Sequence, residues 1–343
     1  MAEQEQEQEQ EQEQEQEQEQ EQEQTVVSVG LDGSPASVAA AHWAAAEAER
    51  RHVPLRLVHA REPMPTPDFA REGVEERQVR AAQELVERMR EDVLDRHPGL
   101  RVTSEVVAED PEVALLRVAD ASQMLVLGSY GMRRLPSFFL GSTSLAAVAR
   151  ADRPVVLVRV DEDPDGSAEG HTAAGGPQPP TAAGRRRGHA EHEEYEVHPH
   201  GPRVVVAVGL GHTYENLLRF AFESARATGL PLHVVHAIRL PSHVYVPGGP
   251  VVPHMAVEHR REVEKEVRAL VQPWAERYPD VELHAALRLE GTVQAVVHEA
   301  EGSDLLVVGR CRKHRAPLGP RIGPVAHAAV HHAACPVAVV PHD

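Results

Sequence analysis

Short apolar runs alternate with longer segments of helical periodicity in two stretches of the chain. The first stretch opens with the run 26–31 and the second with 204–210. Near-continuous apolar runs of this length indicate strands buried on both faces, as in parallel sheets. Five runs and four helical segments alternate in each stretch. Because crossovers between parallel strands are right-handed, the pattern predicts an α/β fold of two tandem, doubly wound, parallel five-stranded sheets with helices on both faces.

Several helices have recognisable starts or faces. Ser34-Pro35 predicts the start of the first helix, with serine as N-cap and proline at the first helical position. Charged segments with a repeating apolar face predict long helices over about 73–96 and about 257–278.

The two stretches resemble each other closely enough to indicate a duplicated domain. Matching positions keep a nearly constant offset: 179 residues from Gly30 to Gly209, 177 from His59 to His236, and 182 from Pro154 to Pro336. The chain therefore divides into a low-complexity tail (1–24), a first domain (25–160), a linker (161–202) and a second domain (203–343). The linker is rich in Gly, Pro, Ala and His and has no apolar periodicity.

The tail changes how the charge of the chain is interpreted. Residues 3–24 are eleven uninterrupted Glu-Gln pairs, which cannot bury apolar area, so we expect this tail to be disordered. The formal net charge of -18 falls to about -7 without it, a normal value for a soluble domain. No basic nucleic-acid surface is expected. The basic cluster 185–187 in the linker is either a small binding patch or, as we favour, solvated linker.

Other compositional features point to the cytoplasm. Two cysteines, Cys311 and Cys335, cannot build a disulfide framework and fit a reducing compartment. The N-terminus has no charged and apolar signal-peptide pattern, and no run approaches the roughly 18 apolar residues of a membrane span.

The strongest chemical motif lies in the last strand-helix unit of the first domain. Gly128, Gly131, Gly141 and Ser142 follow the spacing Gly-x2-Gly-x9-Gly-Ser. Glycines let backbone N–H groups approach a phosphate, and the positive end of the helix that begins at 141–142 favours its charge. The neighbouring Thr143 adds a hydroxyl donor, and Arg133 in the intervening loop can neutralise phosphate oxygens. Alternatively, Gly128 and Gly141 are ordinary strand-end and helix-entry glycines.

This motif resembles the ATP-binding signature of the universal stress protein family. The strand that leads into Gly30-Leu31-Asp32 and the strand that ends in His59-Ala60 are similar to the same family's pattern. The resemblance implies that Asp32 faces ribose and adenine, that the backbone at Ala60 touches adenine and that Gly128 lies by the ribose. It also implies that phosphates, with or without Mg²⁺, are held by Gly131, Gly141, Ser142 and Thr143. A turn or capping role for Asp32 remains the alternative.

The second domain departs from this pattern. Aligned by glycines, Asp32 corresponds to Gly211, Gly131 to Arg312 and Gly141-Ser142 to Gly323-Pro324. A proline at the helix start removes a backbone donor. We therefore expect ATP only in the first domain, and a scaffold role for the second. The basic residues of 310–315 leave another anion as an alternative there.

These features favour a stress-response or signalling protein that binds ATP and acts as a nucleotide-responsive module. A slow ATPase and an interaction scaffold without nucleotide are the alternatives. No catalytic residue or metal site is predicted, and His59 and His236 are expected to be structural. The resemblance further implies that the two domains pair through their last strands. A homodimer of chains is left open, a signalling partner is unknown, and neither nucleic acid nor membrane is expected as a partner.

Overall fold

The computed structural model describes residues 25–62, 68–130, 141–160, 201–211, 214–238, 253–312, 315–316, 319–320 and 322–343. The Glu-Gln tail and most of the linker lie outside these ranges, so what the sequence predicts for them stays a prediction.

The first half folds as the predicted alternation of strands and helices. Its elements are β1 (Val27–Gly30), α2 (Pro35–Arg51), β2 (Leu55–Ala60), α3 (Asp68–Arg96), β3 (Val102–Val107), α4 (Pro111–Asp120), β4 (Met124–Tyr130), α5 (Ser142–Arg150) and β5 (Val155–Val160). Helix α2 begins where Ser34-Pro35 predicts, because the Ser34 hydroxyl accepts a hydrogen bond from the Ser37 backbone N–H at 3.1 Å. Helix α3 begins earlier than the predicted position near residue 73.

The second half repeats this order. Its elements are β6 (Val204–Ala207), α6 (Glu215–Thr228), β7 (Leu232–Ala237), α7 (Pro253–Arg277), β8 (Leu283–Arg288), α8 (Thr292–Glu299), β9 (Leu305–Cys311), β10 (Arg315–Ala316), β11 (Gly319–Pro320), α9 (Pro324–His332) and β12 (Val337–His342). The small antiparallel ribbon of β10 and β11 is an element that the hydrophobic pattern does not predict.

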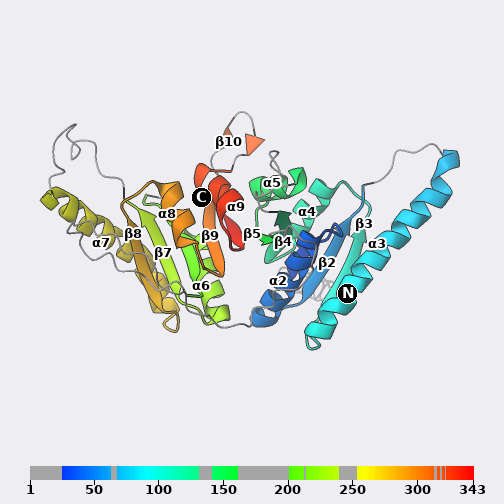
Figure 1. The fold of residues 1–343 in the computed structure, drawn as a ribbon, viewed down its shortest axis with the longest axis horizontal. Coiled ribbons are helices and arrows are strands. Elements are labelled where there is room, and N and C mark those ends of the chain that lie inside the picture. Colours follow the sequence, from blue (N-terminus) through cyan, green and yellow to red (C-terminus); the bar gives the residue numbers. More distant parts are fainter. Residues whose placement is uncertain are drawn as a thin grey trace, which may run out of the picture.

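All strands except β10 and β11 join in one sheet with the order β3-β2-β1-β4-β5-β12-β9-β6-β7-β8. Neighbours within each half are parallel, which confirms the doubly wound α/β class. The two five-stranded sheets are joined through their last strands, as the resemblance implies, because β5 pairs antiparallel with β12 and places Val156 opposite Ala338. Figure 1 shows these last strands meeting in the middle of the molecule.

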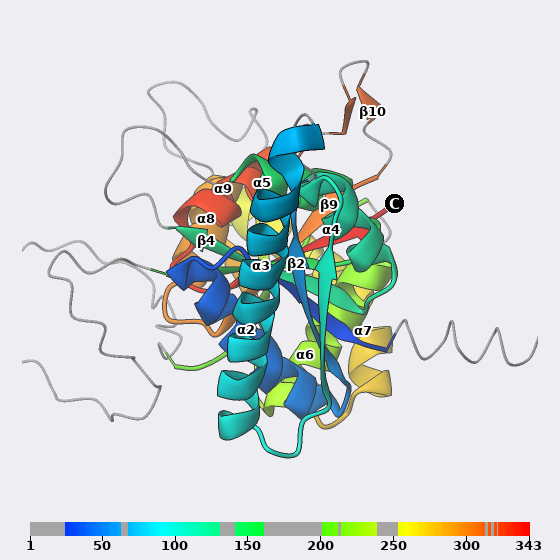
Figure 2. The same cartoon turned by 90° about the vertical axis from the view of Figure 1, so that its right-hand side faces the viewer.

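Two helical layers cover the joined sheet. Helices α2, α3, α6 and α7 share one apolar core with one face, and α4, α5, α8 and α9 share another with the opposite face. Figure 2 shows the layers end-on, with α5 and α9 above and α2 and α6 below. Each core contains residues of both halves, so burial of apolar side chains is continuous across the seam. Over the described ranges, no helix combines the length and apolar character needed to cross a membrane.

Arginines tie the two halves together beside the β5–β12 pairing. Arg159 at the end of β5 donates hydrogen bonds to the carbonyls of Ala333 and His331 (2.6 Å for His331), where α9 ends. Arg310 of β9 reciprocates by donating to the carbonyl of Ala151, where α5 ends. Carbonyls at a helix end have no partner within the helix and carry partial negative charge, so each guanidinium neutralises a helix terminus of the other half.

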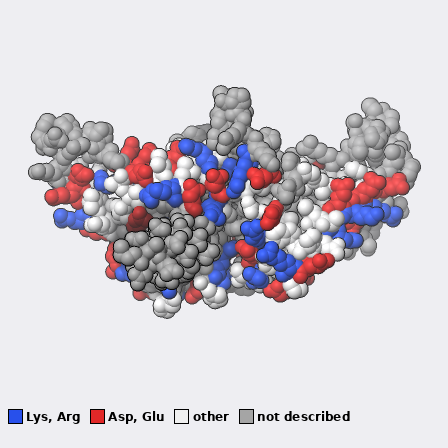
Figure 3. Space-filling view, turned by 180° about the vertical axis from the view of Figure 1, so that it is seen from behind, with Lys and Arg blue, Asp and Glu red and all other residues white. Residues whose placement is uncertain are grey.

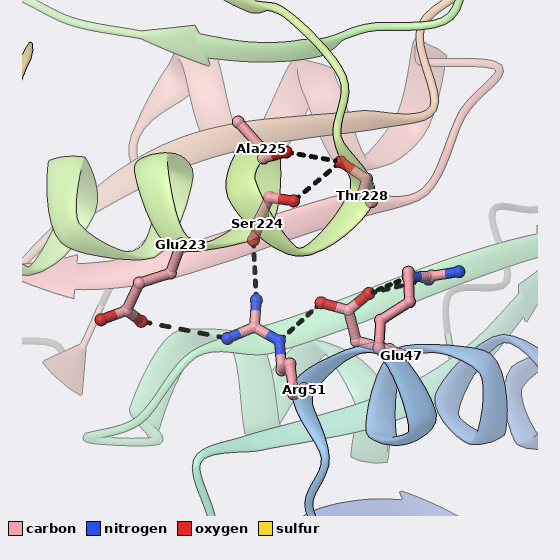
Figure 4. Close-up of polar contacts among 7 residues, drawn as sticks. Glu47, Arg51, Glu223, Ser224, Ala225 and Thr228 are labelled. Carbon is pink, nitrogen blue, oxygen red and sulfur yellow. Dashed lines mark hydrogen bonds and ion pairs between the residues drawn. The ribbon is translucent and has the colours of Figure 1, made fainter. Parts of the chain in front are cut away.

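A third arginine joins α2 to α6 (Figure 4). Arg51 donates to the carboxylate of Glu47 at 2.6 Å and to the Ser224 hydroxyl at 2.8 Å, and its guanidinium lies over the Phe220 ring. Glu47 is only 1% exposed, and Arg50 binds its other carboxylate oxygen at 2.7 Å. The buried negative charge is therefore fully paired, as burial of a carboxylate requires.

Replacing Arg159 with methionine is expected to lower the free energy of unfolding by about 1–3 kcal/mol, because the carbonyls at the end of α9 lose a charged donor. Urea unfolding followed by circular dichroism measures the loss. The matched control is Arg150→Met, which removes an ion pair to Glu112 from a half-exposed site and is expected to cost about 0–1 kcal/mol. Equal losses in the two variants would contradict the role of Arg159 at the seam.

Candidate functional site

The reversal of strand order in the first half lies between β1 and β4, whose carboxyl ends face the same edge of the sheet. Connections from β1 run toward β2 and β3, whereas β4 is followed by β5 on the other side. Doubly wound sheets form a crevice at such a point. Asp32 follows the end of β1, Ala60 ends the neighbouring β2, and Gly128 lies near the end of β4. The structure thus brings these three predicted residues to one edge.

Asp32 is held by its own turn. Its Oδ1 accepts a hydrogen bond from the Ser34 backbone N–H at 2.9 Å, and Gly33 between them has φ +81°. Partial burial favours the neutral acid, but hydrogen bonds from the Ser34 hydroxyl, the Ser34 backbone and Ser37 outweigh it, so the pKa of Asp32 lies below its ordinary value. The turn role that the sequence left open is therefore present, and the carboxylate remains exposed and ionised at this edge of the sheet.

The two matching histidines make the same backbone contact in both halves. His59 in β2 contacts the Leu31 carbonyl through Nδ1 at 2.7 Å, and His236 in β7 contacts the Val208 carbonyl at 2.9 Å. Since a carbonyl only accepts, Nδ1 carries the proton in both rings. Each histidine fixes the direction in which the chain leaves the central strand of its half.

Gly128 allows α2 to lie very close to β4. A Cβ atom at this position would meet the Ala36 carbonyl carbon at 2.3 Å and the Ser37 nitrogen at 2.6 Å, both backbone atoms. Helix α2 buries six alanines on its inner side, so small side chains on both elements produce the close approach. Packing alone therefore requires glycine here, whatever role the Gly128 backbone has at the crevice.

Helix α5 begins at the same edge of the sheet. Gly141 is its N-cap and has no side chain to accept from the first-turn N–H groups. Gly141 and Ser142 are exposed and Thr143 is partly exposed. In contrast to Gly128, a Cβ atom added at Gly141 would meet no atom of the described residues within 4 Å, so their packing does not require glycine there. The helix end thus presents N–H groups, two hydroxyls and the positive end of its dipole to solvent.

Two further residues of the predicted motif, Gly131 and Arg133, lie outside the described residues. Their expected contacts with phosphate stay predictions.

Strand register corrects the alignment of the second half. Val27 pairs with Leu55 and Val204 with Leu232, which makes Leu31 equivalent to Val208 and Asp32 equivalent to Gly209. The predicted match of Asp32 to Gly211 is therefore wrong, because the connection from β6 to α6 is three residues longer than that from β1 to α2. The matches of Gly131 to Arg312 and Gly141 to Gly323 agree with the register of β9 and the N-cap of α9.

Aromatic side chains fill the equivalent edge in the second half. Tyr214 is buried, and its hydroxyl accepts a hydrogen bond from the Gly209 backbone N–H at 3.2 Å. Its ring lies 4.9 Å from that of His342, which is also buried. A Cβ at Gly309, the counterpart of Gly128, would meet the His342 ring at 2.6 Å. Tyr214 and His342 thus occupy space beside both glycines, and burial raises the pKa of the Tyr214 hydroxyl.

Two arginines of the basic segment 310–315 have partners of their own. Arg310 is 5% exposed and donates to the Ala151 carbonyl, and burial lowers the pKa of its guanidinium. Arg312 donates to the Asp152 carbonyl at 2.9 Å. Both side chains therefore lie at the seam between the halves and not at a crevice of the second half.

Comparison with known proteins agrees with this architecture. A family model described as the universal stress protein family matches residues 25–159 and again 202–341. Universal stress protein Rv2005c of Mycobacterium tuberculosis (strain ATCC 25618 / H37Rv) is 30% identical over 323 residues, which cover 91% of this chain and 96% of that protein. The crystal structure of a universal stress protein from Archaeoglobus fulgidus DSM 4304 covers 93% of this chain and 98% of its own, with TM-score 0.53 at 14% identity.

The strand order and the repeat of the same elements in both halves define a tandem, doubly wound α/β protein. With both halves matched by the same family model and a full-length relative at 30% identity, the chain belongs to the universal stress protein family.

Sequence reasoning missed Tyr214 and His342. A signal was present, since the offset between the halves is 177 at the histidines but 179 at the glycines used for the alignment. Because the offset falls from one element to the next, the match of Gly30 to Gly209 lies two residues out of register, and this hides the longer connection after β6.

Gly128→Ala is expected to lower the free energy of unfolding by about 1–3 kcal/mol, because its methyl group collides with the α2 backbone. Gly141→Ala is the matched control: its φ of -53° and ψ of 142° suit any residue, so the change should stay within about 0.5 kcal/mol. Guanidinium unfolding followed by the fluorescence of the two tryptophans, Trp43 in α2 and Trp274 in α7, compares them. A Gly128→Ala variant as stable as Gly141→Ala would contradict the close approach of α2.

Proposed function

We propose that this universal stress protein binds ATP in its first half and acts in stress response or signalling as a nucleotide-responsive module. Asp32 is assigned to the ribose and adenine, with the backbones of Ala60 and Gly128 beside them. Phosphates are assigned to Gly131, Arg133, Gly141, Ser142 and Thr143. Mg²⁺, where it accompanies the nucleotide, is assigned to the phosphates and the hydroxyls of Ser142 and Thr143.

The observation that carries the proposal is the difference between the two crevices. In the first half, an ionised carboxylate and a helix N-terminus without a side-chain cap lie at one sheet edge. In the second half, Gly209 replaces the carboxylate, and Pro324 stands where Ser142 stands in the first. If only the first half binds nucleotide, these groups are expected to be kept in the first half and lost from its duplicate.

The chemistry of the retained groups suits a nucleoside triphosphate. A carboxylate accepts hydrogen bonds from both ribose hydroxyls, and ionisation makes those bonds stronger than neutral ones. First-turn N–H groups and hydroxyls donate to phosphate oxygens, while the helix dipole adds favourable charge. Slow hydrolysis of ATP, or an interaction role without nucleotide, are the competing functions that the following experiment separates.

Ser142→Pro is expected to abolish ATP binding without unfolding the protein. Proline is favoured at the first helical position, and Gly141 already has the extended ψ that a residue before proline needs. The substitution copies Pro324 and removes one N–H and one hydroxyl. Melting with and without ATP-Mg²⁺ should show a rise of roughly 5–10 °C in the wild type at ATP one hundred times its Kd, and none in the variant.

Thr292→Pro is the matched control, because Thr292 is the first residue of α8 and also follows a glycine N-cap. It should keep the full response to ATP. A rise that survives in Ser142→Pro would move the site away from α5, and no rise in the wild type at millimolar ATP would favour the nucleotide-independent role. Phosphate release under the same conditions distinguishes binding from hydrolysis.

A further inference from the structure

Charge alone does not mark a second binding site on this protein. Figure 3 shows Lys and Arg lying among Asp and Glu over the described part of one face. Within helices, opposite charges pair one turn apart, as Arg219 does with Glu215 and Arg268 with Glu264. A site away from the predicted crevice therefore depends on side chains that bind a ligand by other means than a surplus of charge.

Helix α9, near the middle of the molecule in Figure 1, carries two histidines one turn apart. His327 and His331 are four residues apart, which places both on the same side of the helix. Their ring centres lie 4.4 Å apart, with the ring planes at 53° to each other. His327 is exposed and His331 is 9% exposed, so the pair of imidazoles reaches solvent through His327.

The distance between the two rings suits a shared metal ion. Two imidazoles that bind one tetrahedral zinc ion through Zn–N bonds of about 2.0–2.1 Å have ring centres about 5 Å apart. The rings of His327 and His331 are already close to that separation, so small side-chain rotations bring a nitrogen of each ring to one ion. Each imidazole has two nitrogens, and a hydrogen bond at one of them orients the ring and leaves the other to bind the metal.

The surroundings of the pair include charges of both signs. Carbonyls at the end of a helix carry partial negative charge, which favours a cation. Arg159 donates to two of these carbonyls, those of His331 and Ala333, and its positive charge opposes a dication. Burial lowers the pKa of His331, and the neighbouring charges of His327 and Arg159 lower it further. The ring is therefore favoured in the neutral form, which binds transition metals through a nitrogen lone pair and needs no negative charge.

We propose that His327 and His331 bind one divalent transition-metal ion of the class of Zn²⁺, and that the ion holds the C-terminal half of α9 in place at the seam. Over the described ranges no group of three His, Cys, Asp or Glu side chains could hold a metal, so water completes the coordination of these two imidazoles. Chelation closes one helical turn next to the carbonyls that Arg159 binds. Aligned by the glycine N-caps, α5 has Leu145 and Ala149 at the equivalent positions, so the site belongs to the second half alone.

The test uses the full chain without nucleotide and Zn²⁺ as the probe. Amide hydrogen exchange is measured by mass spectrometry of peptide fragments, with Zn²⁺ and with a chelator. Zn²⁺ should slow exchange in α9 of the wild type several-fold and leave α5 unchanged, because the ion stabilises only the helix that it binds. His327→Gln should abolish this slowing. The matched control His332→Gln removes the next exposed histidine of the same helix, which points to a different side, and should keep the slowing.

A third variant separates metal binding from the contact between the two rings. His327→Cys removes the ring but supplies a thiolate, which also binds Zn²⁺, so it should keep the slowing that His327→Gln loses. Melting curves in chelator first establish that each variant is folded. Equal slowing in His327→Gln and His332→Gln would overturn the proposal. So would Zn²⁺ binding detected by calorimetry without any slowing in α9 of the wild type, since the ion would then bind to histidines elsewhere in the chain.

Discussion

The antiparallel pairing of β5 with β12 is the contact on which the rest of this architecture depends. Each half alone would end in a Val-rich edge strand with unpaired backbone groups, a template for unwanted association. Joining the edges satisfies those groups and makes both apolar cores continuous. Val156 and Ala338 lie in one core, and Leu157 and Val337 lie in the other. The pairing also brings the helix ends at Ala151 and Ala333 within reach of arginines from the opposite half.

Close packing beneath the crevice of the first half constrains its chemistry. Because Gly128 lets α2 approach β4, the turn after β1 is short, and Asp32 is fixed by Ser34 at the sheet edge. In the second half α6 lies farther from β9, as the nearest α6 contact of Gly309 is the Leu217 side chain at 3.5 Å. The longer connection there places Tyr214 in this space, beside His342 at the end of β12. The change in loop length thus alters both the packing and the polar groups at the edge.

Local sequence signals predicted most of the fold and only part of the candidate site. Ser34-Pro35 located the start of α2 because capping depends on neighbouring residues, and the glycine motif located the start of α5 for the same reason. The contacts of Arg159 and Arg310 span more than 150 residues along the chain, so no local pattern reveals them. The packing role of Gly128 was equally hidden, since it depends on the distance between α2 and β4.

Two residues of the second half, at and near the position of the first-half glycine motif, make contacts at the seam between the halves. By strand register, Arg310 and Arg312 stand where Ser129 and Gly131 stand in the first half. The two arginines reach across to the carbonyls at Ala151 and Asp152. The arginine at the position of Gly131 thus removes one glycine of the predicted motif, and both arginines add interdomain hydrogen bonds. A duplicated domain can accept that exchange because its partner retains Asp32 and the helix start at Gly141, and the added contacts stabilise the pairing that both halves require.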